Sequence, residues 1–349
     1  MSDLSNWKVR GPVGTLRTEF AEWDPLEAKW QAPRHFTFAV FRPEGKISSC
    51  DFHNPDESVL RSSWVYDEGG RLVETQSGTN DGSPEKVLYS YDSAGRHVRT
   101  VHVNHNGGER ESEACTYDIR GRKTKIRFLD PQPNAAYSCG VEGMEHAYGA
   151  PGATTMTVIH DERHQPVEVL FHDVNRIVVR QVIFKRDATN RLLSEEMHLG
   201  EQFLFPDVQK QLEASSPEDH AKAVAIFEKV FGGRQTFSTT TYEYDQHGQL
   251  VGRNTRMSVL SEERTTFRYN EHGDRIEETT SSSNREMEID EAGNLRPTSE
   301  TSYQQQSRIE YTYDRSGNWT ERVVWGRIEP NPDFQRSNVE RREITYQAL

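Results

Sequence analysis

The heptapeptide YDEGGRL, which spans Tyr66 to Leu72, decides how this chain is expected to fold, because copies of it recur along most of the sequence. Strong copies begin at Tyr91 (YDSAGRH), Tyr117 (YDIRGRK), Tyr244 (YDQHGQL) and Tyr313 (YDRSGNW). Weaker copies begin at Phe41 (FRPEGKI), His160 (HDERHQP), Arg186 (RDATNRL), Tyr269 (YNEHGDR) and Ile289 (IDEAGNL). A unit repeated at a basic spacing of about 25 residues indicates a repeat architecture.

Each copy has the chemistry of a tight turn. The Asp side chain can accept hydrogen bonds from backbone N–H groups a few residues further on, and Gly three positions later tolerates the left-handed conformation that closes a hairpin. The copy at 160–166 fits least well, because His164 takes the place of Gly. The predicted turn residues are Asp67, Gly70, Asp92, Gly95, Asp118, Gly121, Asp245, Gly248, Asp290, Gly293, Asp314 and Gly317.

The flanks of the turns alternate with a period of two, which is the signature of a β-strand. Tyr242 and Tyr244 would point to one face, and Thr241 and Glu243 to the other. The sequence therefore predicts an all-β protein, an elongated array of antiparallel β-hairpins. The tyrosines that precede the turn Asp would share one face, either as a core between two layers or as a strip on which sugars stack.

On these heptapeptides the chain resembles the YD-repeat family, also called the RHS-repeat family, over residues 36–325, as a small stand-alone member. The family includes bacterial rearrangement-hotspot proteins, wall-associated proteins, large subunits of some insecticidal toxin complexes, and teneurins. Large members spiral into a shell around a cargo domain, whereas about ten repeats are too few to enclose a protein. The resemblance implies a hairpin fold and, as an alternative function, a component of a toxin-delivery or cell-surface system.

Two interruptions divide the array. Residues 1–35 are expected to form an N-terminal lead-in and cap, and residues 36–349 the array itself. The first interruption, 129–157, is rich in Pro and Gly and is expected to be a loop that either covers a sheet edge or binds a ligand. The second, 198–236, contains SSPEDHAKAVAIFEKVFGG, which predicts one inserted α-helix over 217–231.

Bulk properties narrow the function classes. The net charge of −13 argues against a nucleic-acid partner, since phosphate binding requires concentrated positive charge. No run approaches 18 apolar residues, so no membrane span is expected, and the N-terminus lacks a signal-peptide core. These features predict a cytoplasmic protein, one exported without a cleaved signal, or a mature form with an added Met. Three cysteines predict reduced thiols, with a Cys115–Cys139 bridge as the alternative.

The search for catalytic chemistry gives no enzyme, cofactor or metal prediction. No nucleophile elbow, zinc-protease, Walker A or dinucleotide motif is present. A calcium ladder of turn carboxylates is the weaker alternative to carboxylates occupied by backbone N–H groups. The arginines after Gly (Arg71, Arg96 and Arg122) are expected to brace neighbouring aromatic rings or carboxylates.

The predicted function is non-enzymatic binding or scaffolding, in which a large polar β-surface is presented to a protein or a glycan. Trp64 and Trp325 are the predicted positions for ligand stacking. An enzyme with a site under the 129–157 loop is the third alternative. The sequence ends at RREITYQAL, one heptapeptide short of a return strand, so the last strand is expected either to pair inward or to leave an edge for association with another molecule.

Overall fold

The computed structural model describes residues 7–32, 34–54, 56, 58–79, 84–128, 136–138, 147–149, 153–200, 216, 236–257, 260–290 and 295–347. Within these ranges the protein is all-β and contains no helix, so the all-β part of the predicted fold class is confirmed. The predicted helix at 217–231 lies outside the described residues. The turn residue Gly293 and the thiol of Cys139 lie outside them as well.

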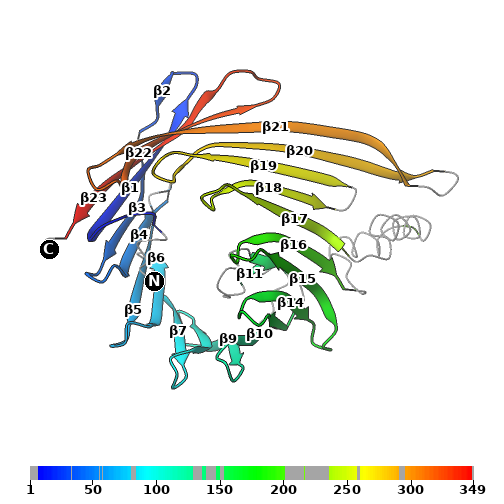
Figure 1. Cartoon of the computed structure of the whole chain (residues 1–349). Helices are drawn as coiled ribbons and strands as arrows, with labels where there is room; N and C mark the ends of the chain where they lie inside the picture. Colours follow the sequence, from blue (N-terminus) through cyan, green and yellow to red (C-terminus); the bar gives the residue numbers. More distant parts are fainter. Residues whose placement is uncertain are drawn as a thin grey trace. The chain divides into compact units, whose positions relative to one another are not determined.

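The strands follow one another as hairpins along the chain (Figure 1). The first ten are β1 (Val13–Asp24), β2 (Lys29–Trp30), β3 (Arg34–Phe41), β4 (Ile47–His53), β5 (Val59–Tyr66), β6 (Leu72–Thr79), β7 (Glu85–Tyr91), β8 (His97–Val103), β9 (Glu109–Tyr117) and β10 (Lys123–Phe128). The next seven are β11 (Ala136–Ser138), β12 (Ala147–Gly149), β13 (Thr155–His160), β14 (Pro166–His172), β15 (Val178–Arg186), β16 (Leu192–Leu199) and β17 (Thr236–Tyr244). The last six are β18 (Leu250–Met257), β19 (Ser261–Tyr269), β20 (Arg275–Ile289), β21 (Leu295–Tyr313), β22 (Trp319–Ile328) and β23 (Gln335–Tyr346).

The ends of the hairpin succession are joined, which corrects the prediction of an elongated array. β1 pairs antiparallel with β3 on one side and with β23 on the other. Leu16, for example, lies opposite Ala39 of β3 and Ile344 of β23. An elongated array would leave its first and last strands unpaired on their outer sides. The sequence could not show this pairing, because its partners are more than 300 residues apart.

The same pairing answers the question of the C-terminal edge. β23 pairs with β22 through residues such as Val339, opposite Val323, and with β1 through residues 338–346. It therefore pairs inward, and its outer edge is not available for association with another molecule. Within residues 1–35, which are predicted to be a lead-in and cap, β1 and β2 belong to the main sheet.

The predicted 129–157 loop contains short strands. β11 pairs antiparallel with β12, with Tyr137 opposite Tyr148, and the end of the segment enters β13. Prediction of a plain loop was wrong at these residues, because strands of three residues are too short to show an alternation of polar and apolar side chains. The remaining residues of the segment before Ala153 lie outside the described ranges.

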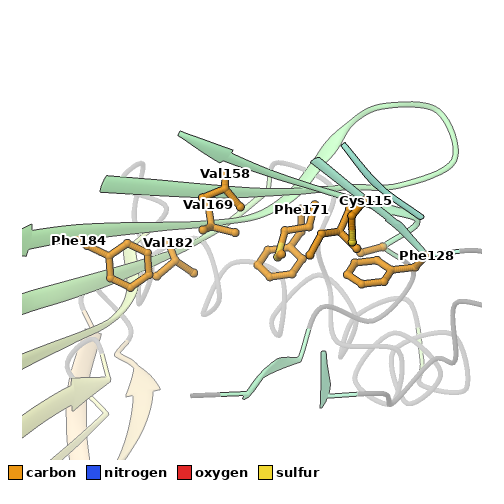
Figure 2. Close-up of a cluster of buried hydrophobic side chains, with 10 residues drawn as sticks. Cys115, Phe128, Val158, Val169, Phe171, Val182 and Phe184 are labelled. Carbon is orange, nitrogen blue, oxygen red and sulfur yellow. The ribbon is translucent and has the colours of Figure 1, made fainter. Parts of the chain in front are cut away.

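The chain divides into two compact units, each with its own apolar cluster. The first comprises residues 1–112, 268–278 and 305–349, and its cluster is built around Leu16, Ala39 and Cys50, all fully buried. The second comprises residues 113–267 and 279–304. Figure 2 shows its cluster, in which Val169, Phe171 and Val182 from adjacent strands are fully buried.

Burial in the cluster of the first unit raises the pKa of the Cys50 thiol to about 12, so that thiol stays protonated at neutral pH.

Candidate functional site

The heptapeptide turns share one hydrogen-bond pattern. In the turn that begins at Asp67, the N–H of Asp67 donates to the carbonyl of Arg71 and the N–H of Gly70 donates to the carbonyl of Asp67, each at 2.9 Å. The Asp67 carboxylate accepts the Arg71 N–H at 2.8 Å. Gly70 has a φ of 75°, in the left-handed region. The turns that begin at Arg42, Asp92, Asp118, Asp161, Asp187, Asp245, Asn270 and Asp314 repeat the backbone bonds.

The pattern tolerates residues other than glycine at the left-handed position. His164 and Asn190 have φ values of 67° and 72°, and both turns keep their backbone bonds. Sequence reasoning missed two turns of the same kind, at 104–108 and 173–177. The first carries Asn104 with Gly107 three residues later, so the pattern without its aromatic residue would have found it. In the second, Arg176 is left-handed, and no glycine marks it.

The turn predicted at Asp290 and Gly293 stays a prediction. Asp290 directly follows β20, whereas Asn270 precedes that strand, so the two residues lie at opposite ends of one strand. The bonds that would close a turn at 290–294 lie outside the described residues. This position accounts for the irregular spacing of that copy in the sequence.

The residue after the left-handed position links several of the turns to a neighbouring hairpin. Arg71 contacts its own Asp67 through Nε at 2.7 Å and lies over the ring of Tyr91, 5.1 Å from its centroid. Tyr91 in turn donates its hydroxyl to the carbonyl of Leu72 at 2.6 Å. Arg191, Tyr244 and the Leu192 carbonyl repeat this arrangement in the second unit. The repeated tyrosines are half-buried braces between hairpins and are not fully buried core residues.

The turn carboxylates are occupied by donors from their own turn. Asp118 Oδ1 accepts the backbone N–H groups of Arg120 and Arg122, and Oδ2 accepts Arg122 Nε at 2.6 Å. The Arg122 N–H and guanidinium hold the pKa of the Asp118 carboxyl at about 2. Among the described residues, no three His, Cys, Asp or Glu side chains are grouped so that they could hold a metal ion.

The turn that begins at Asp314 differs because Asn318 replaces the arginine. Asn318 is 1% exposed and accepts the Arg10 N–H at 2.6 Å through Oδ1. Its Nδ2 donates to the Arg10 carbonyl and to the Tyr346 hydroxyl, and Tyr346 donates to Asp314 at 2.5 Å. This turn therefore holds both the N-terminal segment and the last strand. We call these contacts of Asn318, Arg10 and Tyr346 the closing contacts.

The two tryptophans predicted for ligand stacking lie in different surroundings. Trp64 of β5 is half-buried and packs against the apolar cluster built around Leu16, Ala39 and Cys50. Its ring therefore contributes to the core of the first unit. Trp325 of β22 is also half-buried, but it lies beside the arginines Arg308 and Arg336.

Three indole rings surround one guanidinium at this second position. Arg336 lies opposite Trp325 in the β22–β23 pair, 4.9 Å from that ring centroid. It is also 4.9 Å from the Trp23 ring and 5.9 Å from the Trp30 ring, and those two rings meet edge to face at 5.0 Å. On the other side of Trp325, Arg308 of β21 lies directly opposite in the ladder.

A fourth aromatic ring extends the surface. Phe334 lies 4.1 Å from the guanidinium of Arg308 and 5.1 Å from that of Arg327. We call these seven residues the Trp–Arg cluster: Trp23, Trp30, Trp325, Phe334, Arg308, Arg327 and Arg336. Arg308 and Arg336 are exposed, and the four aromatic rings are half-buried. Sequence reasoning identified only Trp325, because the others meet it through the pairings of β1, β2, β21 and β23.

The charges of the Trp–Arg cluster are directed at rings. Within the described part of the chain, no carboxylate lies within ion-pair distance of Arg308, Arg327 or Arg336, whereas arginines such as Arg253, Arg268 and Arg341 have one. The indole Nε1 of Trp325 is buried and has no acceptor in that part. The cluster therefore combines apolar ring surface with available positive charge on a chain of net charge −13.

Comparison with known proteins does not assign a family. No protein-family model and no curated protein matches the chain. Among solved structures, a chain of TcdB2-TccC3-TEV matches at 13% identity and a TM-score of 0.36, covering 91% of this chain, which spans only 14% of that chain's length. A porin-like protein from Bacteroides uniformis matches at 9% identity and a TM-score of 0.32. The match covers 97% of this chain and 98% of the porin-like chain. A putative outer membrane lipoprotein-sorting protein domain from Vibrio parahaemolyticus matches at 10% identity and a TM-score of 0.16. The match covers 60% of this chain and 91% of that domain.

One more finding concerns membranes. Among the residues that the structure describes, there is no helix with the length and apolar character needed to cross a bilayer.

Proposed function

We propose that this protein is a non-enzymatic binding protein that recognises an acidic glycan at the Trp–Arg cluster. The observation that carries the proposal is the environment of Arg336, which lies within 6 Å of three indole rings and pairs with no carboxylate in the described part of the chain. Aromatic rings offer apolar faces and edges for the C–H faces of sugars. Guanidinium groups bind carboxylates and sulfates through paired, charge-assisted hydrogen bonds.

The arrangement supports a glycan that carries charge along its length. Arg308, Trp325 and Arg336 lie opposite one another on three adjacent strands, so cation, ring and cation alternate across the sheet. Neighbouring strands are about 4.8 Å apart, which puts the two guanidinium-bearing strands roughly 10 Å apart. That spacing suits a polymer whose charged groups recur every one or two sugar units.

The test is a binding measurement on matched polysaccharides. Titration calorimetry would compare a uronic-acid polymer and a sulfated polymer with neutral dextran. We expect binding to the acidic polymers that weakens as salt is raised, because exposed charges are screened. Trp325→Ala and Arg336→Ala should each weaken it at least about tenfold, since a lost contact of about 1.4 kcal/mol corresponds to that factor.

Two controls keep the result specific. Trp64→Phe alters the tryptophan that packs in the core, and Arg61→Ala removes an exposed arginine that pairs with Asp51 and lies outside the Trp–Arg cluster. Both should bind as the wild type does. Equal binding to polyglutamate or to a single-stranded oligonucleotide would contradict a glycan-specific site, and unchanged binding by Trp325→Ala would remove the Trp–Arg cluster from the proposal.

A further inference from the structure

The β20–β21 hairpin has an edge without a partner strand. β20 and β21 are the longest strands, with 15 and 19 residues, and they continue beyond the end of β19 (Figure 1). The pairing of β21 with β22 begins only at Gln305, opposite Ile328. Among the described residues, β20 is the one strand that pairs with β21 before that point, so the opposite edge of β21 has no partner there, and residues 296–303 are all exposed.

This part of the hairpin would gain stability from a further strand. The Arg285 N–H still bonds the carbonyl of Leu260 beside β19, at 2.7 Å, but the hairpin continues beyond it as a ribbon of two strands. A two-stranded ribbon is at best marginally stable in water, and an unpaired edge presents N–H and C=O groups to any extended strand. Such an edge is the standard site for strand addition.

The charges on the ribbon favour a particular partner. Arg296 pairs with Glu288 at 2.5 Å, and Arg285 pairs with Glu300 at 3.3 Å, both across the two strands. On the outer strand Arg296 and Glu300 are therefore four residues apart, have opposite charge and share one face, since side chains alternate with a period of two. An antiparallel copy centred on Thr298 would place Arg296 opposite Glu300 of the second copy, twice by symmetry.

We propose that the β21 edge at residues 296–301 pairs antiparallel with the same edge of a second copy of this chain. The contact is isologous, because each copy gives and receives the same residues. Across the four strands the charges would then alternate: Glu288, Arg296, Glu300 of the second copy and Arg285 of the second copy. Opposite charges facing each other across strands are stabilising, and like charges are destabilising.

Pro297 limits the strength of this dimer. Proline lacks an N–H, and within a sheet it is found on edges, with its nitrogen toward the open side. Each copy would therefore offer one donor fewer at the centre of the contact. We expect a weak, reversible dimer in which the Arg296–Glu300 pairs determine the register.

Sedimentation velocity over a range of protein concentrations tests the proposal, and charge reversal gives it specificity. The wild type should form a dimer as concentration rises, and Glu300→Arg and Arg296→Glu should each stay monomeric because like charges would face each other. An equimolar mixture of the two variants should recover a dimer, since each variant then supplies the charge that the other lacks. Glu310→Arg is the control, because Glu310 is exposed but lies where β21 already pairs with β22.

The opposing results are equally definite. A wild type that remains monomeric at all concentrations would overturn the proposal. A dimer that survives in Glu300→Arg alone, or a mixture of variants that stays monomeric, would show that another surface or another register is used. Circular dichroism of each variant distinguishes loss of pairing from loss of folding.

Discussion

The turn that begins at Asp67 and the turn that begins at Asp314 have the same backbone and different surroundings. Both close with N–H bonds to the carbonyl four residues later and a left-handed glycine. In the first, Arg71 is partly exposed and braces Tyr91; in the second, Asn318 is buried and bonds Arg10 and Tyr346. The backbone of the turn is therefore set by local interactions, whereas the residue after the glycine decides which neighbouring segment the turn contacts.

The largest expected effect comes from restoring the arginine of the repeat at the last turn. Asn318→Arg should lower the free energy of unfolding by about 3 kcal/mol, because it overfills a buried site and leaves the backbone groups of Arg10 without partners. Urea unfolding measures this loss. Arg71→Asn, the reverse exchange in the exposed turn, should cost much less.

Arg10 provides the matched control for the closing contacts. Arg10→Ala keeps the backbone N–H and carbonyl that bond Asn318, whereas Arg10→Pro removes the N–H donor. Arg10→Pro should therefore be clearly less stable than Arg10→Ala. Equal stability of these two variants, or an Asn318→Arg protein as stable as the wild type, would contradict the role given to Asn318.

The next effect isolates the left-handed backbone from packing. Gly248 has a φ of 81°, and a Cβ there would meet no atom within 4 Å. Gly248→Val should cost about 2 kcal/mol, because a side chain disfavours the left-handed conformation. Gly326 of β22 has equally open space but no positive φ, so Gly326→Val is the control and should be neutral or stabilising. Equal losses at both positions, measured by thermal unfolding, would refute the backbone explanation.

A smaller effect has the opposite sign. His164 adopts a φ of 67° where most heptapeptide turns have glycine. His164→Gly should raise the free energy of unfolding by about 0.5–1 kcal/mol. The relief of backbone strain in the folded chain exceeds the cost of the greater conformational freedom that glycine gives the unfolded chain. Arg163→Gly, in the same turn but without positive φ, should lower it. If both variants were destabilised alike, the strain at His164 would be negligible.

The turns could be predicted from the sequence because their interactions span five residues. Asp67 and Gly70 are sufficient to predict their turn, and the same is true of the turns that begin at Asp92 and Asp245. The junction of β1 with β23 could not be predicted, because nothing in a local pattern distinguishes a strand that pairs with its neighbour from one that pairs 300 residues away.

The candidate site was predictable to a smaller extent. Trp64 and Trp325 look equivalent in the sequence, since both lie in alternating segments near a repeat. Only the strand pairings separate them, by placing one against the core and the other against Arg308 and Arg336. Trp23 and Trp30 join the Trp–Arg cluster through a two-residue strand, β2, which is too short to be recognised by its periodicity.

The smallest expected effect concerns pH and the turn carboxylates. The pKa of the Asp118 carboxyl is about 2 in the folded chain and 3.8 without the turn contacts, so the unfolded chain binds more protons between these values. Stability from this group is therefore present above pH 3.8 and is lost as the pH falls toward 2. Asp118→Asn should have a lower unfolding temperature at pH 7, and its difference from the wild type should shrink between pH 4 and pH 2. Glu68→Gln is the control, because Glu68 is an exposed carboxyl within the turn at 67–71. If the difference between Asp118→Asn and the wild type did not change with pH, the loss of stability would come from altered hydrogen-bond geometry and not from the lost charge.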